Sequence, residues 1–141
     1  MNLFGHRDGV PADVGDGFVA GEAVALQTAF TAALTATERR RLPAPVEVTF
    51  ETEGGEHVVV VCRNHTVGFV PPSHEESVRA QVRAAGRAHL ETTGQVYRDD
   101  DGVWRLWVGP PRPGGFPAPE PGADTLKAPQ RRIFGLALPD D

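Results

Sequence analysis

The sequence has a single cysteine, Cys62, and no long apolar run. One cysteine cannot form an internal disulfide, and disulfide frameworks are typical of oxidising compartments. A membrane-spanning helix needs roughly 20 successive apolar residues, which no stretch approaches. Residues 1–16 have neither the basic start nor the apolar segment of a signal peptide. Together these absences predict a protein of the cytoplasm without a membrane partner.

An excess of basic residues is also missing, because the net charge is -5. Non-specific affinity for nucleic acid comes from neutralising phosphates, so this charge argues against a general nucleic-acid binder. A local basic face remains compatible with binding one strand end. Length sets the other limit: 141 residues favour a single domain that buries a core without disulfides or metal.

Motifs of catalysis and metal binding are absent as well. There is no Gly-x-Ser-x-Gly, no glycine-rich phosphate loop after a strand and no paired-carboxylate pattern. The histidines lack i, i+4 spacing and an accompanying Cys-x-x-Cys, so we expect neither a metal nor a cofactor. Cys62 ends a valine-rich strand, where burial raises a thiol's pKa, and is interpreted as a core residue. The enzymatic alternative is a cleft that pairs His65 with an aspartate from residues 99–101.

The apolar pattern of residues 58–72 is the most informative part of the sequence. Two apolar runs, separated by a polar break at Asn64-His65 and followed by Pro71-Pro72, predict a buried β-hairpin. Gly68 in the second run indicates a bulge or a close approach of another backbone segment. The other predicted elements are a helix over 20–42, strands over 46–51, 89–97 and 103–108, and a helix over 73–85 with a Ser73–Glu76 capping box.

The element order from residue 20 is therefore α-βββ-α-ββ. It predicts an α+β fold: a small, strongly twisted antiparallel sheet or partly closed β-barrel with two covering helices. We expect one compact domain over residues 18–109, a flexible lead-in over 1–17 and a proline-rich tail over 110–141. The tail is interpreted as an extended spacer, with a polyproline II ligand for an aromatic-lined groove as the alternative. Its apolar end is expected to dock on the sheet's edge or on a protein partner through Ile133, Phe134, Leu136 and Leu138.

The block from Val58 to Ala85 resembles the middle of a HIRAN domain. That family has a valine-rich strand, a short polar turn, a strand ending in Val-Gly-(Tyr/Phe)-(Leu/Val)-Pro, and a helix that opens on acidic residues. Residues 67–71 here are Val-Gly-Phe-Val-Pro. HIRAN domains are small β-barrels that bind single-stranded DNA ends, so the resemblance implies a barrel and that activity. The family's Asn-Pro-x-Asp-x-x-Ala-Val loop is replaced here by residues 52–57, and no binding residue is transferred.

Candidate binding residues on the second predicted helix are three arginines. Arg79, Arg83 and Arg87 are spaced i, i+4, i+8 and are expected to form one basic stripe suited to phosphate contacts. The plainer interpretation is a solvated helix face, on which Glu75 and Glu76 are placed to pair with Arg79.

The last predicted strand supplies two further candidates. Trp104 and Trp107 point to opposite faces of that strand, so we expect one to be partly exposed or covered by another segment. Core packing of at least one of them is the plainer interpretation. Trp107 shares its face with Arg105, which makes it the better candidate for a surface on which bases stack.

Together, these patterns predict a non-enzymatic binding or interaction module of the bacterial cytoplasm, an accessory protein of a larger complex with a protein partner. Single-stranded nucleic acid is the alternative ligand. Either would bind through Arg79, Arg83, Arg87, Arg105 and Trp107.

Overall fold

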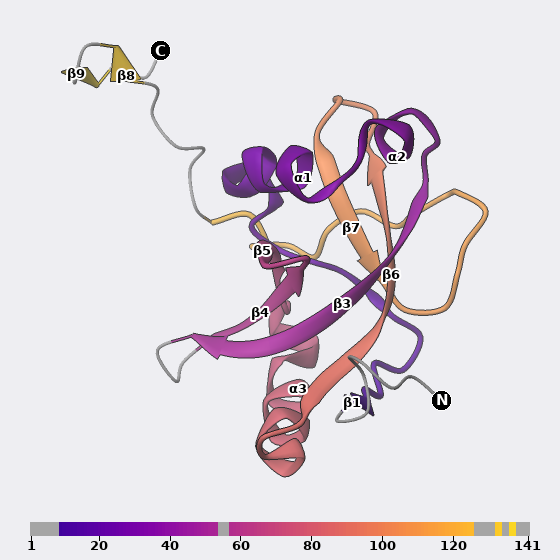
Figure 1. The fold of residues 1–141 in the computed structure, drawn as a ribbon, viewed down its shortest axis with the longest axis vertical. Coiled ribbons are helices and arrows are strands. Elements are labelled where there is room, and N and C mark those ends of the chain that lie inside the picture. The colour runs from indigo at the N-terminus through magenta and orange to yellow at the C-terminus, as the bar shows by residue number, and fades with distance from the viewer. Residues whose placement is uncertain (1–8, 54–56, 126–131, 134–135, 138–141) are drawn as a thin grey trace.

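The computed structural model describes residues 9–53, 57–125, 132–133 and 136–137. The strands of its main sheet are β1 (Gly9–Pro11), β2 (Phe18–Val19), β3 (Ala44–Glu53), β4 (His57–Cys62), β5 (His65–Phe69), β6 (His89–Arg98) and β7 (Trp104–Val108). The helices are the 3-10 helix η2 (Ala23–Leu26), α1 (Gln27–Ala33), α2 (Ala36–Arg40) and α3 (Pro72–Ala85). Six strands form an antiparallel path in the order β2-β7-β6-β3-β4-β5, and β1 pairs parallel with the start of β6 (Figure 1). The predicted α+β class is confirmed.

The sheet curls until its two end strands meet. Just after β2, Gly21 donates its N–H to the carbonyl of Phe69 in β5 at 2.7 Å, and Phe69 donates back at 2.9 Å. A Cβ on Gly68 would lie 2.4 Å from the Cβ of Ala20, so only glycine permits this approach. The pairing register of β4 and β5 also shifts between Val60 and Val61. Gly68 therefore marks both a bulge and a close backbone approach, and the sheet is the partly closed barrel that was predicted.

Helices cover the two ends of this curled sheet. Figure 1 shows α1 and α2 at one end and α3 at the other. Helix α1 packs against β5, while α3 packs against β3, β4 and β6 and buries Val78 completely. Alternating strand residues face the space between them, and the buried members on β3 and β4 are Val46, Val48, Phe50, Val58, Val60 and Cys62.

The single helix predicted over residues 20–42 is wrong. Leu34 has extended backbone angles and ends α1, and Thr35 then starts α2 as its N-cap. The Thr35 hydroxyl accepts the Glu38 N–H at 3.1 Å, while the Glu38 carboxylate accepts the Thr35 N–H at 2.9 Å. This capping box stabilises a new helix start, which the apolar periodicity alone does not reveal.

Helix α3 begins earlier than predicted. The predicted Ser73–Glu76 capping box is wrong, because Pro71 is the N-cap, Pro72 occupies the first turn and the Ser73 hydroxyl bonds to Glu120. Proline suits the first helical position because its missing N–H has no partner there in any case. The β4–β5 turn is likewise shifted by one residue, since Arg63 and Asn64 have φ angles of 50° and 68°. Positive φ at both central residues is typical of a two-residue hairpin turn.

Segments on either side of the expected 18–109 domain belong to the same fold. In the expected lead-in, β1 pairs with β6 and Val14 is buried. Residues 110–125, called the strap below, run back over β6 and β7, and Ala123 is buried. The boundaries expected at 18 and 109 therefore differ from those of the packed unit.

The apolar end of the tail forms a separate two-stranded sheet of β8 (Arg132–Ile133) and β9 (Leu136–Ala137). These strands pair with each other and not with the main sheet, so the structure does not show the expected edge pairing. Phe134 and Leu138 lie outside the described residues. Within the described ranges, no helix is long and apolar enough to cross a membrane.

Candidate functional site

A pocket of about 520 Å³ opens where the sheet closes. Its floor comes from the end of β5 and the bridge beside it, one side from the start of α3, and the other side from the end of the strap. It is called the seam pocket below. Phe69, Val70, Pro71, Pro72 and Ala123 make much of its lining apolar.

One polar wall of the seam pocket is a histidine–glutamate pair. His57, at the start of β4, has its Nδ1 atom 3.5 Å from the Oε2 atom of Glu75 on α3. The Glu75 carboxylate also lies 3.2 Å from a guanidinium nitrogen of Arg79. The edge of the His57 ring faces Phe69, with ring centroids 5.9 Å apart. Since 60% of the His57 side chain is exposed, its imidazole can reach a ligand at the rim.

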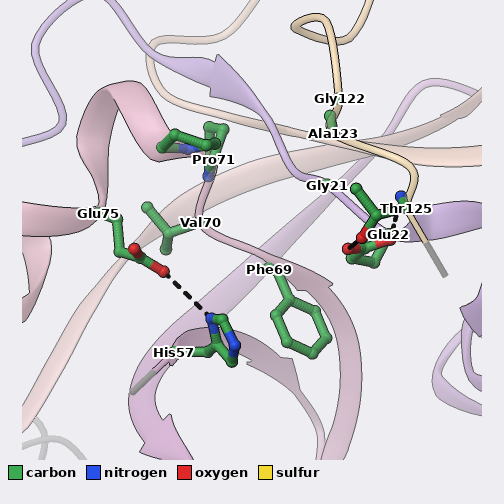
Figure 2. Close-up of a pocket in the computed structure, with 11 residues that line it drawn as sticks. Gly21, Glu22, His57, Phe69, Val70, Pro71, Glu75, Gly122, Ala123 and Thr125 are labelled. Atoms are coloured by element: carbon green, nitrogen blue, oxygen red, sulfur yellow. Dashed lines mark hydrogen bonds and ion pairs between the residues drawn. The ribbon is translucent and has the colours of Figure 1, made fainter.

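The opposite wall joins the strap to the segment after β2. The carboxylate of Glu22 accepts the Thr125 N–H at 2.7 Å and also bonds the Thr125 hydroxyl. The Glu22 N–H donates to the Ala123 carbonyl at 2.8 Å. Glu22 has a φ of 60°, a left-handed conformation that non-glycine residues rarely adopt and that often occurs at functional sites. Figure 2 shows the Glu22–Thr125 pair and the His57–Glu75 pair on opposite sides of the pocket.

The polar side chains that the structure describes in the seam pocket come from four residues. Its described lining contains an imidazole, two carboxylates and a threonine hydroxyl, but neither serine nor cysteine as an activated nucleophile. Among the residues that the structure describes, no group of His, Cys, Asp and Glu is arranged to hold a metal ion. His65 and Asp99 are joined by no hydrogen bond or ion pair in the described part of the chain.

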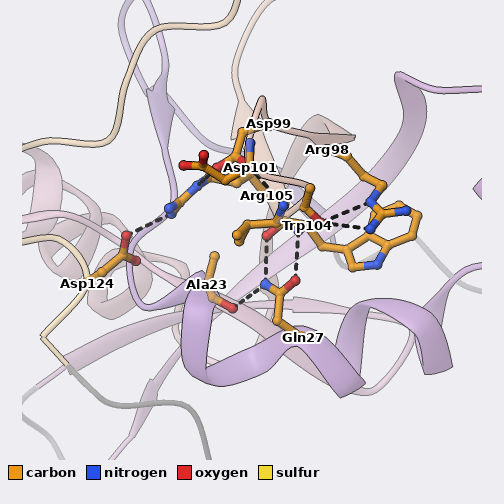
Figure 3. A network of polar contacts seen from close by, with 10 residues as sticks. Ala23, Gln27, Arg98, Asp99, Asp101, Trp104, Arg105 and Asp124 are labelled. Atoms are coloured by element: carbon orange, nitrogen blue, oxygen red, sulfur yellow. Dashed lines mark hydrogen bonds and ion pairs between the residues drawn. The ribbon is translucent and has the colours of Figure 1, made fainter. Parts of the chain in front are cut away.

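Arg105 and Trp107 are buried, so Trp107 is not the stacking surface for which it was the candidate, and the expected cover by another segment is present. Arg105 is 8% exposed and Trp107 3% exposed. The Arg105 guanidinium bonds Asp99 on one side and Asp124 of the strap on the other, both at 2.9 Å (Figure 3). The Trp107 indole N–H donates to the Pro110 carbonyl at 2.8 Å. The strap covers this face of the sheet, and the tryptophans on both faces of the last strand indicated a covering segment without identifying it.

The Asp99 carboxylate organises the β6–β7 turn. It accepts the N–H groups of Asp101 and Val103 as well as the Arg105 bond. Burial alone would raise the pKa of Asp99, but these hydrogen bonds outweigh it and hold the pKa below its usual range. Residues 99–102 thus form the hairpin turn between β6 and β7, and Asp99 has a structural role in it.

The basic stripe predicted on α3 is interrupted. The helix ends at Ala85, and Gly86 has a φ of 62°, so Arg87 lies beyond the helix. Arg79 pairs with Glu75, as the plainer interpretation expected, while Arg83 and Arg87 are exposed. The five candidate residues therefore do not form one surface, since Arg105 and Trp107 are buried.

Cys62 is a core residue, as the sequence indicated. Its side chain is 1% exposed, and desolvation raises the pKa of its thiol despite the nearby Arg63 guanidinium. A buried thiol with a raised pKa is a poor nucleophile at neutral pH.

Sequence reasoning did not locate the seam pocket. No sequence pattern singled out His57, and Glu22 and Thr125 carried no signal because 103 residues separate them. The one usable signal was the Phe69–Pro72 block, in which rigid apolar residues follow the end of a strand. The rest of the pocket is formed by contacts between residues far apart in the sequence, such as Glu22 and Thr125.

The fold and this pocket define a small α+β barrel with a ligand-sized pocket at its seam. No protein-family model matches the chain, and no curated protein or solved structure matches it either. The resemblance of residues 58–85 to HIRAN domains therefore stays a prediction, and the functional argument rests on geometry.

Proposed function

We propose that the protein is a non-enzymatic binding module of the bacterial cytoplasm, and that it takes an apolar anchor group of a protein partner into the seam pocket. The size and lining of the pocket carry this proposal. Its volume of about 520 Å³ lies within the range of roughly 300–1,000 Å³ that is typical of ligand pockets. Such pockets combine apolar walls with a few polar groups that fix the orientation of the ligand.

The residues around the pocket support a partner side chain as the ligand. Phe69, Pro71 and Pro72 are preformed by a strand end and a helix start, so binding an anchor requires little ordering of the protein. His57 stands at the rim, where it can exchange hydrogen bonds with the partner's backbone. Aromatic and aliphatic anchors in such pockets usually contribute most of an interface's affinity.

Single-stranded nucleic acid has less support as the ligand. Two of the residues expected to bind it, Arg105 and Trp107, are buried, and Arg79 is paired with Glu75. No separate observation in the described structure favours this alternative.

Selection of peptides from a random phage-displayed library tests the proposal. Peptides that bind the full chain are labelled and titrated by fluorescence anisotropy against three variants. We expect Phe69→Ala and His57→Ala to weaken binding about tenfold or more, equivalent to about 1.4 kcal/mol. His89→Ala, which removes an exposed histidine at the start of β6, is the matched control and should bind as the wild type does.

Far-UV circular dichroism checks that each variant is folded. Failure to select any peptide contradicts the proposal, and so do selected peptides that bind Phe69→Ala and His57→Ala unchanged. A labelled oligothymidylate titrated at low and physiological salt is run beside the peptides. Salt-sensitive binding of that strand without peptide binding would assign the protein to nucleic acid instead.

A further inference from the structure

The outer face of β6 and β7 carries a compact set of large side chains. Gln95 lies directly opposite Trp107, and Tyr97 directly opposite Arg105, so all four share one face of the sheet. Each is at most 8% exposed. The strap covers this face, which lies apart from the floor of the seam pocket.

Two of these side chains bond the backbone of the strap. The Gln95 amide donates to the Arg112 carbonyl at 2.8 Å and accepts the Arg112 N–H at 2.7 Å. The Trp107 indole donates to the Pro110 carbonyl at 2.8 Å. These three hydrogen bonds recognise an extended backbone without regard to its side chains.

Side chains of the strap then contact the aromatic rings beneath them. The Phe116 ring stacks on Tyr97 with centroids 4.0 Å apart and planes 12° from parallel. The Arg112 guanidinium lies 5.1 Å from the centre of the Trp107 ring, a cation–π distance. These contacts select an arginine and, four residues later, an aromatic residue.

The covered face has the chemistry of a proline-peptide groove. Grooves that recognise proline-rich segments are lined by aromatic rings, and the extended ligand loses little conformational entropy on binding. The strap has this composition, with prolines at positions 110, 111, 113, 117, 119 and 121. The plainer interpretation of the tail as a spacer does not account for its bonds to Gln95 and Trp107.

We propose that the outer face of β6 and β7 is a recognition groove for a proline-rich segment of a partner protein, with an arginine and a phenylalanine four residues apart, and that the strap is its internal ligand. Because the strap follows β7 directly, its effective concentration at the groove is on the order of millimolar. A partner segment must compete with the strap. The groove therefore binds a second protein only in the fraction of molecules in which the strap has dissociated from it.

The test uses the full chain and a fluorescein-labelled peptide with the sequence of residues 109–120. An opened variant, Arg112→Ala with Phe116→Ala, removes both side chains of the strap that contact the rings but leaves the groove unchanged. We expect it to bind the peptide at least about tenfold more tightly than the wild type, because the internal competitor is weakened. Adding Gln95→Ala to the opened variant should weaken that binding again, and a peptide with alanine at both contact positions should not bind.

Tyr97, the single tyrosine, reports whether the groove is uncovered. Burial raises its pKa to about 12, and the opened variant should bring the pKa toward the ordinary value of about 10. Tyrosinate absorbance measures this shift, with circular dichroism at each pH to confirm that the sheet is intact. A matched variant, Arg83→Ala with Arg87→Ala, alters two exposed arginines elsewhere and should change neither readout.

Three results would overturn the proposal. One is an unchanged Tyr97 titration in the opened variant, which would show that the two side chains do not hold the strap. Another is an uncovered Tyr97 without any gain in peptide binding. The third is a wild-type dimer at high protein concentration that the peptide dissociates, which would make the strap of a second copy the occupant in place of a different protein.

Discussion

Three glutamine side chains each bond both backbone groups of one residue in a distant segment. In every pair, the side-chain amide donates to a backbone carbonyl and accepts the N–H of the same residue. Such a pair supplies a hydrogen-bond partner to a backbone N–H and a backbone carbonyl at once. The pairs are Gln27 with Trp104, Gln81 with Asp13, and Gln95 with Arg112.

Glu38 carries the largest pKa decrease among the described carboxylates. The hydrogen bonds from Arg63, at 2.6 and 2.9 Å, are the main cause, followed by the Thr35 N–H, and the pKa falls from 4.5 to about 2. Arg63 also donates to the Ala33 carbonyl at 2.9 Å. One carboxylate therefore caps α2 and connects the end of α1 with the β4–β5 turn.

Replacing Glu38 with glutamine should lower stability in a way that depends on pH. A carboxylate whose pKa is depressed by folding stabilises the fold above its unfolded pKa, and this contribution is lost as pH falls from about 4.5 to about 2. Because the Arg63 side chain is 47% exposed, solvent screens the pair, and we expect about 1 kcal/mol near pH 7. The Tm difference between wild type and Glu38→Gln should be about 3–5 °C at neutral pH and shrink toward zero near pH 2.

Glu47→Gln, on an exposed position of β3, is the control for the general effect of removing a negative charge. A Tm difference between wild type and Glu38→Gln that stays constant from pH 7 to pH 2 would contradict the expected link between the Glu38 pKa and stability. Thermal melts followed by circular dichroism across this pH range measure it.

At the level of elements, period-two alternation predicted the strands well and helical periodicity predicted the helices less well. The strands over 46–51, 89–97 and 103–108 are present because each buries at least one face on a common core. The predicted 20–42 helix is divided, because the Thr35–Glu38 capping box competes with continued helix. The hydrophobic pattern indicates which residues are buried. The break in the helix depends on hydrogen bonds that this pattern does not encode.

Closure of the sheet depends on one close approach between elements. Gly68 in β5 and Ala20 after β2 come together where Gly21 and Phe69 form the closing bridge. The sequence indicated a close approach at Gly68, but it did not identify the approaching segment. Partners that are 48 positions apart become neighbours only when the whole sheet has curled.

Gly68→Ala should destabilise the barrel, and Ala20→Gly should relieve that effect. The new Cβ would lie 2.4 Å from the Cβ of Ala20, so the end strands must separate. Overpacking of this kind costs about 1–3 kcal/mol. In a double-mutant cycle measured by urea unfolding, we expect the Ala20→Gly/Gly68→Ala chain to be more stable than the sum of the single effects predicts. Additive effects would show that the two positions do not meet.

For the whole molecule, the sequence predicted the barrel but not the two surfaces that are proposed to bind partners. Trp107 and Arg105 were correctly placed on one face of the last strand, yet that face is covered by the strap. The strap was interpreted as a spacer because a proline-rich composition indicates an extended backbone. Composition does not indicate which surface that backbone packs against. The candidate site depends on contacts between the two ends of the sequence, such as Glu22 with Thr125.

Two truncations should distinguish the contribution of the strap to stability from that of the residues that follow it. A chain ending at Thr125 retains the contacts of Phe116, Ala123 and Asp124 with the barrel, and β8 and β9 pair only with each other. We therefore expect it to melt at the same temperature as the full chain.

A chain ending at Gly109 exposes Tyr97 and Trp107 as an apolar patch and leaves Arg105 without Asp124. It should melt about 5–10 °C lower, corresponding to roughly 2 kcal/mol, and associate at high concentration. Thermal melts and light scattering measure both effects, and limited proteolysis of the full chain should leave a fragment that retains the strap. Equal melting temperatures and a monomeric chain after truncation at Gly109 would show that the strap is the spacer that its composition suggests.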